Sequence, residues 1–518
     1  MTTTTTAAVL AVDLANVYDA PKAGKLLYTL AWGDYVDVLE VTDTHLRIAT
    51  HTYQERSDGS ILPVATEAWL VPPKSARRNG RRLKPADLVI PRADSRVLKV
   101  NFVDVQQGDG AVIETPGGKV MLVDGGDNQM FARYLAARYR GSRAEAPKVI
   151  DCILVTHGDA DHFSGLTQIQ RSETNAEPRK RLFIEPRRIY HNGLVKRSKT
   201  GRKETELLGP TLDADGIKLL TPLLDSPLQV PAEAMNTDFR AWRKALEAWQ
   251  ARAAQLGHPG IEFRRLSEGQ HDAFDFLRDE DIDVQVLGPL LREAGGASGL
   301  PFLGSTPSGP RVGHESLDIG AEGFAGFSAS HTINGHSIVF RLRYGGFNYL
   351  FCGDLNDEAG RTLARQHDAG EIDLRAEVFK VPHHGSADFS GGLFKRVESI
   401  VNIVSSGDDP MNEYIHPRAT LMGALGRYSR VDEPLVFVTE LVAFFRLEGW
   451  AHLSDKEKAE KRGDFFAFSR SAYGLVKTRT DGKRLLVYTD SGKADLKEAY
   501  CYELDADGVP QPAVVIKV

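Results

Sequence analysis

The chain has 518 residues, a length that at about 150 residues per domain predicts three domains or one large domain with appendages. Hydrophobic residues make up 42% of it and charged residues 26%, which is typical of a globular protein and excludes wholesale disorder or a fibrous repeat. The 64 Lys and Arg residues against 70 Asp and Glu give a net charge of -6, so any nucleic-acid binding needs a local basic patch.

Cysteine usage and apolar runs bear on where the protein works. Cys152, Cys352 and Cys501 are too few and too scattered for a disulfide framework or a cysteine-rich zinc site, which favours a reducing compartment. No stretch approaches the roughly 20 apolar residues of a membrane helix, since the most apolar run, 435–445, contains Glu440. The first residues lack the basic and apolar regions of a signal peptide. We therefore expect a cytoplasmic protein without a membrane partner.

Residues 1–75 predict a small β domain. Short apolar segments alternate with turn-forming residues such as Gly24, Gly33 and Asp34, a pattern typical of a small barrel. The segment VYDAPKAGKLLYTLAWGDYVDVLE also resembles a bacterial SH3-like domain, and this resemblance implies a protein or peptide partner. Residues 76–96 are rich in Pro and Arg without apolar periodicity, so we expect a basic linker there.

Strands alternate with helices in residues 97–433, the expected main domain. This rhythm predicts a sheet covered by helices, with the chemistry in loops at the strand ends. Residues 171–275 interrupt the rhythm and are interpreted as an insertion into this domain. They contain a predicted helix over 238–256, in which the 3.6-residue period places four large side chains on one face: Phe239, Trp242, Leu246 and Trp249.

The last segment, 434–518, also carries strand patterns. A hairpin is predicted to turn at Asp481-Gly482, a pair that favours a tight two-residue turn. These strands either complete a sheet of the main domain or form a small appended β unit, and the sequence leaves both open.

The strongest chemical signal is the motif THGDADHFSG, which follows the apolar strand VIDCILV. It places four side chains that can bind metal within six residues at a strand end, namely His157, Asp159, Asp161 and His162. Imidazole and carboxylate ligands suit zinc, and the carboxylate share also admits manganese. The alternative is an acidic helix cap beside two hydrogen-bonded histidines. It is disfavoured because later segments supply further ligands.

Two later strand ends complete the ligand set. Asp354 follows an apolar strand in FCGDL, and His383 and His384 follow another in KVPHHGS. A carboxylate at a strand end can bridge two cations, and an imidazole from a neighbouring strand can close the ligand shell. Taken together and in this order, the motifs are specific for a metal centre.

These motifs resemble the metallo-beta-lactamase fold, in the group of the hydrolase domain of the ComEC competence protein. The resemblance covers residues 97 to about 430 and rests on FVDVQQGDG, LVDGG, THGDADHFSG, NGHSIVFRLRYGGFNYLFCGDL, VPHHGS and SSGDDPMNEYIHP. It implies an α/β fold with a four-layer αββα sandwich, in which two mixed sheets lie between helices. It also implies two metal ions in a cleft along one sheet edge.

The resemblance further implies which residues hold the metal ions. Asp354 would bridge the two ions. His157 and Asp159 would hold one ion, and Asp161 and His162 the other. The shell would be closed by His384, with His383 as the second choice.

Other positions would support this centre or use it. Asp124, in LVDGG, would orient the histidine motif without binding metal. The wider fold has a further histidine where this chain offers Asn334, with His331 and His336 close by, and the sequence does not say which of them completes the shell. His416, in EYIHP, would contact substrate or donate a proton, the alternative being a structural histidine before a proline turn. The expected catalytic residues are thus Asp161, Asp354 and His416.

One departure from the wider fold bears on the metal. Many members read His-x-His-x-Asp-His, whereas Asp159 stands here in place of the middle histidine, as in the ComEC group. The substitution makes the site more anionic and harder, which favours manganese or mixed occupancy. We expect two divalent metal ions, Zn or Mn.

The expected reaction is hydrolysis by a hydroxide that two metal ions activate. In-line attack on a phosphodiester suits such a centre, and the favoured activity is that of a phosphodiesterase or nuclease acting on DNA. Basic residues interleaved with Phe183 and Tyr190 are expected to guide the strand, namely Arg179, Lys180, Arg181, Arg187, Arg188, Lys196 and Arg197. A solvated basic loop is the alternative interpretation of this segment.

Two other functions stay open at this point. A small-molecule hydrolase, similar to a phosphocholine esterase or a lactamase, would use the insertion to cap its pocket. A binding protein with a vestigial hydrolase would recruit a partner through the SH3-like segment, and the intact ligand set argues against it. Salt dependence separates a nuclease from a small-molecule hydrolase, because polyanion binding falls steeply with salt.

Overall fold

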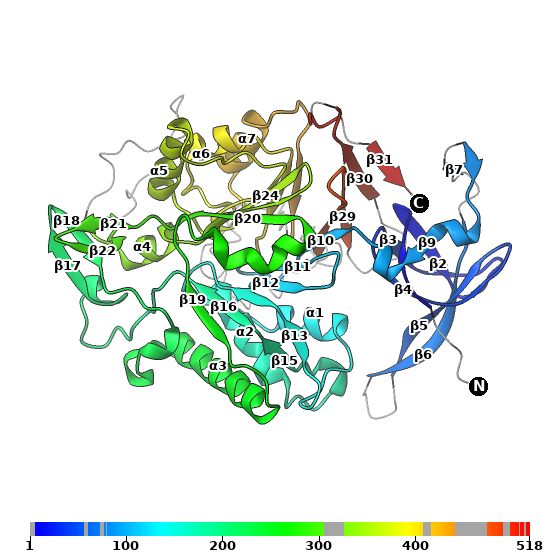
Figure 1. Cartoon of the computed structure of the whole chain (residues 1–518), viewed down its shortest axis with the longest axis horizontal. Helices are drawn as coiled ribbons and strands as arrows, with labels where there is room; N and C mark the ends of the chain where they lie inside the picture. Colours follow the sequence, from blue (N-terminus) through cyan, green and yellow to red (C-terminus); the bar gives the residue numbers. More distant parts are fainter. Residues whose placement is uncertain are drawn as a thin grey trace, which may run out of the picture.

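The computed structural model (Figure 1) describes residues 6–55, 61–72, 77–78, 80–304, 326–407, 416–440, 474–490, 498–506, 508–511 and 514–517. Within these ranges the protein is a mixed α/β structure. Residues 408–415 of the motif SSGDDPMNEYIHP and residues 441–445 of the apolar run lie outside the described residues. None of the helices in the described ranges is long and apolar enough to cross a membrane.

The N-terminal residues form a seven-stranded antiparallel sheet, drawn in blue in Figure 1. One face of this sheet buries a small core that includes Val17, Leu46, Ile48 and Leu70. Its strand order is β3-β2-β6-β5-β4-β1-β9, and β3 and β9 are not paired with each other among the described residues. The structure therefore shows the predicted β domain as a sheet and does not show a barrel. The strands are β1 Thr6–Leu10, β2 Leu14–Tyr18, β3 Leu26–Ala31, β4 Tyr35–Val41, β5 Leu46–Glu55, β6 Ile61–Leu70 and β9 Val89–Pro91.

Part of the segment expected to be a linker belongs to this sheet. β9 pairs with β1, and Leu88, at the end of the 3-10 turn Pro85–Leu88, is fully buried in the same core. The short strands β7 (Arg77–Arg78) and β8 (Arg81–Arg82) pair with each other. A short apolar run such as Leu88–Pro91 has no periodicity of its own, because its place is decided by pairing with a strand about 80 residues earlier.

Two mixed sheets form the main body of the molecule. The larger sheet has ten strands in the order β19-β16-β14-β12-β11-β10-β28-β29-β30-β31. They are β19 Glu262–Arg265, β16 Arg188–His191, β14 Cys152–Leu154, β12 Val120–Asp124, β11 Gly110–Glu114, β10 Leu98–Phe102, β28 Leu475–Thr480, β29 Arg484–Asp490, β30 Glu498–Glu503 and β31 Val514–Lys517. The smaller sheet has six strands in the order β20-β23-β24-β25-β26-β27. They are β20 Ile282–Gly288, β23 Val339–Tyr344, β24 Phe347–Phe351, β25 Val378–Lys380, β26 Val401–Val404 and β27 Leu435–Val438.

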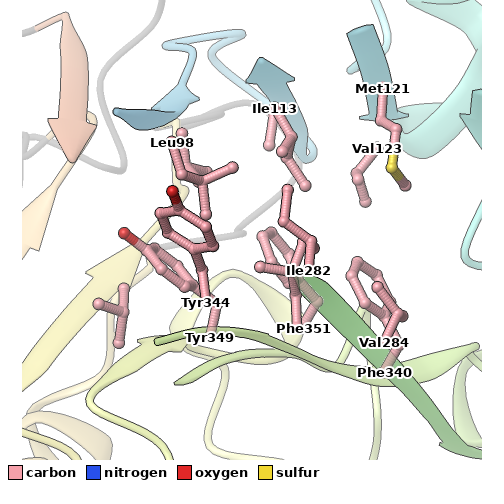
Figure 2. Packing of buried hydrophobic residues seen from close by; sticks show 14 of the residues in the cluster. Leu98, Ile113, Met121, Val123, Ile282, Val284, Phe340, Tyr344, Tyr349 and Phe351 are labelled. Carbon is pink, nitrogen blue, oxygen red and sulfur yellow. The ribbon is translucent and has the colours of Figure 1, made fainter. Parts of the chain in front are cut away.

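The two sheets pack face to face through one apolar core. Figure 2 shows side chains of β10, β11 and β12 opposite those of β20, β23 and β24. Phe340 and Phe351 stack with ring centroids 4.6 Å apart and an interplanar angle of 7°. Neighbouring residues along these strands are also apolar and face the other way, so both faces of each sheet are buried.

Helices cover the two outer faces (Figure 1). Helices α1 (Met130–Arg138), α2 (Ala160–Ser172) and α3 (Thr237–Gln255) pack on the ten-stranded sheet. Helices α5 (Asp357–Asp368), α6 (Gly391–Val397) and α7 (Ala419–Arg427) pack on the six-stranded sheet. The layers therefore follow the order helix, sheet, sheet, helix.

The segment interpreted as an insertion contributes directly to the larger sheet. β16 pairs in parallel with β14, and β19 pairs in parallel with β16. Helix α3 begins after the N-cap Asn236 and buries Phe239, Trp242, Leu246 and Trp249, the face that the periodicity predicted. A separate four-stranded sheet lies at one end of the molecule and has the order β17-β18-β22-β21, from Thr211–Ala214, Ile217–Leu220, Ala297–Pro301 and Arg292–Ala294.

The C-terminal strands extend the ten-stranded sheet rather than forming a unit of their own. β28 pairs with β10 over five residues, which carries β29, β30 and β31 into the same sheet. The N-terminal sheet packs against β29, because Leu14 of β2 and Ala31 of β3 share a core with Leu486 and Tyr488. The guanidinium of Arg484 lies 3.9 Å from the Trp32 ring centre.

Candidate metal centre

The chemical residues lie where strands of both sheets end. Asp124 is the last residue of β12, and the parallel neighbour β14 leads to His157 and then to the N-terminus of α2. In the smaller sheet, β24 leads to Asp354 and its parallel neighbour β25 leads to His384. Parallel strands place their carboxyl ends at one sheet edge, so residues far apart in sequence meet there.

Four of the predicted ligands form one cluster. Ligand atoms of Asp161, His162, Asp354 and His384 all lie within 4.8 Å of one another. Asp354 is at the centre, because its Oδ1 is 3.1 Å from His162 Nε2 and its Oδ2 is 3.2 Å from His384 Nε2. The Nε2 atom of His157 is 3.9 Å from Asp354 Oδ2, which places this residue beside the cluster.

The far nitrogens of two of these histidines face acceptors. His162 Nδ1 is 2.9 Å from Asp124 Oδ2, and His384 Nδ1 is 3.1 Å from the Ser405 carbonyl oxygen and 3.2 Å from Asp109 Oδ1. Since carboxylates and carbonyl groups accept hydrogen bonds, Nδ1 carries the hydrogen in both rings. In the neutral form of each ring, Nε2 is therefore the nitrogen without a hydrogen, and it faces Asp354.

His157 has the same tautomer for a less direct reason. Its Nδ1 is 3.2 Å from Thr156 Oγ1 and 3.3 Å from Ser337 Oγ. The Thr156 hydroxyl donates to Asp124 Oδ2 at 2.7 Å, and the Ser337 hydroxyl donates to the Asn334 carbonyl oxygen at 2.8 Å. Both hydroxyl oxygens are thus left to accept from His157, whose Nε2 is free of hydrogen.

These atoms meet the requirements of a metal site. The Nε2 atoms of His157, His162 and His384 and the Oδ1 atom of Asp354 are buried without a partner of hydrogen-bond geometry among the described residues. Buried polar atoms without partners are costly, and a divalent cation among them satisfies all of them at once. The nitrogen and oxygen donors fit zinc or manganese.

The electrostatics of the cluster point the same way. Burial lowers the pKa of His162 and His384, but the Asp354 carboxylate and the partners Asp124 and Asp109 raise it well above its usual value. Burial raises the pKa of Asp354, and the His384 and His162 rings lower it well below its usual range. The carboxylates therefore hold positive charge at this point, whether it is carried by protons or by a cation.

Asp159 is not in the cluster that the sequence led us to expect. It occupies the N-cap position of α2 without a side-chain capping hydrogen bond, and its carboxylate forms an ion pair with the ammonium of Lys196. Burial raises the pKa of Asp159, and the Lys196 charge opposes this rise. The assignment of His157 and Asp159 to one ion stays a prediction, because the structure places Asp159 against a lysine.

His383 and His416 lie together at one side of the centre. The His383 ring is 6.4 Å from the His416 ring between centroids, and it is not part of the metal cluster among the described residues. His416 precedes a cis peptide bond to Pro417. Burial and the His384 and His383 rings lower the pKa of His416 to about 3.

The residues around α4 (Ala329–Gly335) have separate surroundings. His336 Nε2 is 2.7 Å from the Pro301 carbonyl oxygen, which turns this ring away from the cluster. His331 lies between two carboxylates, Asp388 at 3.4 Å and Glu358 at 3.6 Å, and these raise its pKa to about 9 against the effect of burial. The backbone carbonyl of Asn334 anchors Ser337, so Asn334 supports His157 through that hydroxyl.

Sequence reasoning did not single out several residues that touch the ligands. Gln107 donates to Asp161 Oδ2 at 3.2 Å, and Gly108 allows the chain to approach, since a Cβ there would lie 1.8 Å from the Asp161 carbonyl oxygen. Asp109, Ser337 and Lys380 also lie in this region. Gln107, Gly108 and Asp109 stand in the quoted motif FVDVQQGDG and Lys380 opens KVPHHGS, so a signal was present.

The structure separates the seven predicted basic residues into two groups, one away from the metal cluster and one on its side. Arg179 and Lys180 pair with Glu177, Arg187 with Glu185, Arg188 with Glu262, and the Arg181 side chain donates to the Asn175 carbonyl oxygen. These residues precede or open β16, at the amino end of the parallel strands, whereas the metal cluster lies at their carboxyl ends. Only Lys196 and Arg197, of the seven, follow β16 on the side of the cluster.

Comparison with known families agrees with this geometry. Residues 103–182 match the family described as the metallo-beta-lactamase superfamily. No curated protein matches the chain. The matched segment contains Asp109, Asp124 and the motif THGDADHFSG, whereas Asp354 and His384 lie beyond it. The chain therefore contains a metallo-beta-lactamase superfamily domain, and its buried histidine and aspartate cluster combines residues inside and outside the matched range.

Proposed function

We propose that this metal-dependent hydrolase of the metallo-beta-lactamase superfamily acts on phosphodiesters. The observation that carries the proposal is the position of Lys196, whose ammonium reaches Asp159 at the edge of the metal cluster. A phosphodiester bears a negative charge on its non-bridging oxygens, whereas a neutral ester or amide does not. Lys196 is paired with Asp159, but its ammonium has three N–H donors, and a donor left for the substrate beside the metal centre favours an anionic oxygen.

The backbone presents Lys196 rigidly. Val195, before it, is buried, and the Lys196 carbonyl oxygen accepts a hydrogen bond from the amide of Asn236, the N-cap of α3, at 3.1 Å. The next amide, of Arg197, donates to the Leu207 carbonyl oxygen at 2.8 Å. The lysine side chain is therefore aimed at Asp159 by a segment that is tied on both sides.

The chain's own residues divide the work as follows. His157, Asp161, His162, Asp354 and His384 would hold metal, with Asp159 able to offer its second carboxylate oxygen. Bound divalent cations activate water and neutralise charge on phosphoryl oxygens. Lys196 binds a non-bridging oxygen of the substrate. His416, with His383 beside it, contacts the substrate as a neutral ring, because its low pKa leaves it without the proton that a general acid needs.

The finer assignments follow from the motifs. We propose two divalent ions, Zn or Mn, and membership in the ComEC-like group, supported by the Asp159 position and by the order of the six motifs. We also propose, from the sequence patterns, that the N-terminal sheet is SH3-like, that it binds a protein or peptide partner and that the protein is cytoplasmic. The packing of that sheet on β29 and β30 supports a role for it as part of the hydrolase body.

DNA is the polymeric substrate that we put first. Five of the seven predicted basic residues lie away from the centre and are engaged by local partners, so they add little support for a long strand. Lys196 and Arg197 support phosphodiester recognition near the cluster. A compact phosphodiester is therefore the alternative substrate, and a comparison of the two decides between them.

The test compares substrates that differ in charge and size. Metal-stripped protein is supplied with Mn, Zn or Mg and assayed on single- and double-stranded DNA, bis-p-nitrophenyl phosphate and neutral p-nitrophenyl acetate. Lys196→Met is expected to lower diester turnover roughly 100- to 1000-fold, as the loss of one oxyanion donor does, and to spare the neutral ester. Lys199→Met, at an exposed lysine three residues away, is the matched control.

The outcomes separate the candidates. Cleavage of DNA that is lost in Asp161→Ala and Asp354→Ala supports a nuclease, and turnover of the small diester alone supports a phosphodiesterase for compact substrates. Equal loss of ester and diester turnover in Lys196→Met, or hydrolysis of the neutral ester alone, would contradict the proposal.

A further inference from the structure

A buried ion pair lies behind the metal cluster and has no part in the function proposed so far. Lys380 Nζ is 2.7 Å from Asp109 Oδ1, and both side chains are less than a tenth exposed. Lys380 is the last residue of β25, in the six-stranded sheet. Asp109 lies in the loop between β10 and β11, in the ten-stranded sheet. The pair therefore joins the two sheets at the edge that carries the metal ligands.

The same carboxylate oxygen of Asp109 also faces His384. It is 3.2 Å from His384 Nδ1, the nitrogen on the far side of the ring from Asp354, and adds its charge beside the hydrogen bond that Nδ1 makes with the Ser405 carbonyl oxygen. A corresponding arrangement exists on the other side of Asp354, where Asp124 Oδ2 lies 2.9 Å from His162 Nδ1. Asp354 is thus flanked by two imidazoles, and each imidazole has a buried carboxylate behind it.

Three hydrogen bonds to the backbone of Asp109 and its neighbour Gly108 fix the position of Asp109 relative to His384. The Asp109 amide donates to the Asp161 carbonyl oxygen at 3.3 Å, and its own carbonyl accepts from the Gly126 amide at 2.7 Å. The Ser405 hydroxyl donates to the neighbouring Gly108 carbonyl oxygen at 2.9 Å. Ser405 also offers its backbone carbonyl to His384 Nδ1. Ser405 therefore contacts both the loop that carries Asp109 and the His384 ring.

We propose that Asp109 is a positioning residue that acts with the Ser405 carbonyl: its charge keeps the hydrogen of His384 on Nδ1 and so directs Nε2 at the metal, while Lys380 holds Asp109 in place. Without the carboxylate, the Ser405 carbonyl is the remaining acceptor at 3.1 Å, and the ring loses one of the two contacts that orient it. Partners of this kind behind a metal-binding histidine typically contribute about 10- to 100-fold to metal affinity.

A purely structural role is the competing explanation, and the chain offers a matched control for it. Lys99 and Glu114 form a second buried lysine–carboxylate pair, 4.0 Å apart and at most 4% exposed. Glu114 is at the end of β11 opposite to Gly110, so this pair lies away from the metal cluster. Removing either carboxylate costs fold stability, but only the loss of Asp109 is expected to change metal binding.

The experiment measures metal affinity in the full-length protein without relying on turnover. Asp109→Asn, Lys380→Met and the control Glu114→Gln are titrated with Zn in competition with a chelator, and their Co-loaded forms are compared by absorption spectroscopy. Asp109→Asn is expected to weaken Zn binding about 10- to 100-fold and to alter the Co spectrum, with a smaller effect of Lys380→Met in the same direction. Glu114→Gln is expected to lower the unfolding temperature of the metal-free protein without either change.

The proposal rests on the metal site described above but not on the substrate, so a failed phosphodiesterase assay leaves this test intact. Unchanged Zn affinity in a folded Asp109→Asn protein would overturn it. If Asp109→Asn does not fold, the wild-type protein still decides the matter through imidazole nitrogen NMR of the Zn-loaded form. Binding of His384 through Nδ1 overturns the proposal, and binding through Nε2 with a protonated Nδ1 supports it.

Discussion

His162 Nε2 lies 3.1 Å from Asp354 Oδ1, which brings the start of helix α2, on the ten-stranded sheet, against the loop that follows β24 of the other sheet. Asp354 also contacts the Nε2 atom of His384 at 3.2 Å, so one carboxylate joins ligands from two sheets. The metal centre therefore depends on the packing of the two sheets as much as on the local motifs.

Asp354→Ala is expected to abolish metal binding at this cluster and to reduce hydrolysis by more than about a hundredfold. The reason is that even a residue that only orients a metal ligand contributes about 10- to 100-fold, and Asp354 lies among three imidazoles. Metal content after dialysis and turnover are the measurements. Asp368→Ala, which removes an exposed carboxylate paired with Arg396, is the control and should leave both unchanged.

Ser337→Ala is expected to weaken metal binding by roughly tenfold. Its oxygen accepts from the Asp354 amide at 3.1 Å and faces His157 Nδ1 at 3.3 Å, so the change removes an orienting contact from two site residues. Chelator competition measures the effect. Ser399→Ala removes another buried hydroxyl, one that bonds to Asn402 instead, and equal losses in the two variants would contradict a specific role for Ser337.

Glu114 is expected to make stability depend on pH in the acid range. Burial raises its pKa, but Arg138 and Lys99 lower it from 4.5 to about 2. The folded state therefore stabilises the ionised form of Glu114 more than the unfolded state does. This stabilisation is fully present above pH 4.5 and is lost as the pH falls towards 2.

Glu114→Gln tests this pH dependence. Its destabilisation, about 3 kcal/mol near neutral pH from the size of the pKa shift, should shrink between pH 4.5 and 2. Urea unfolding at a series of pH values measures it. Glu145→Gln removes an exposed carboxylate and should show no such trend. A constant difference between wild type and Glu114→Gln across this range would count against the ion-pair explanation.

Phe340→Ala is expected to lower the free energy of unfolding by about 3–5 kcal/mol, the usual cost of removing a buried aromatic side chain. Phe340 is fully buried between the sheets and stacks on Phe351 (Figure 2). Chemical denaturation measures the change. Phe327→Ala, at a phenylalanine that is 45% exposed, should cost much less.

Much of the fold follows from local patterns. The strand ahead of THGDADHFSG, the amphipathic face of α3 and the strand ends at Asp354 and His384 were predictable, because apolar periodicity and strand-end polarity are local properties. The match of residues 103–182 to the metallo-beta-lactamase superfamily agrees with the resemblance drawn from these motifs.

Other parts depend on contacts between distant residues, and local patterns did not reveal them. The segment that forms β9 was interpreted as linker. Its short apolar run has no periodicity of its own and is stabilised only by pairing with the distant strand β1. The segments that form β16 and β19 were interpreted as part of an insertion. They join the sheet by parallel pairing, which needs long crossover connections and therefore produces no pattern in the neighbouring sequence.

The sequence by itself determined the chemical types at the site: two histidines and two aspartates after one strand, and an aspartate and histidines after two others. Only the tertiary structure decided which of them meet. It placed Asp159 against Lys196, gathered Asp161, His162, Asp354 and His384, and put Asp109 with Lys380 behind His384. The physical reason is that side-chain chemistry is carried by each residue, whereas distance and direction between residues are created by strand order and sheet packing.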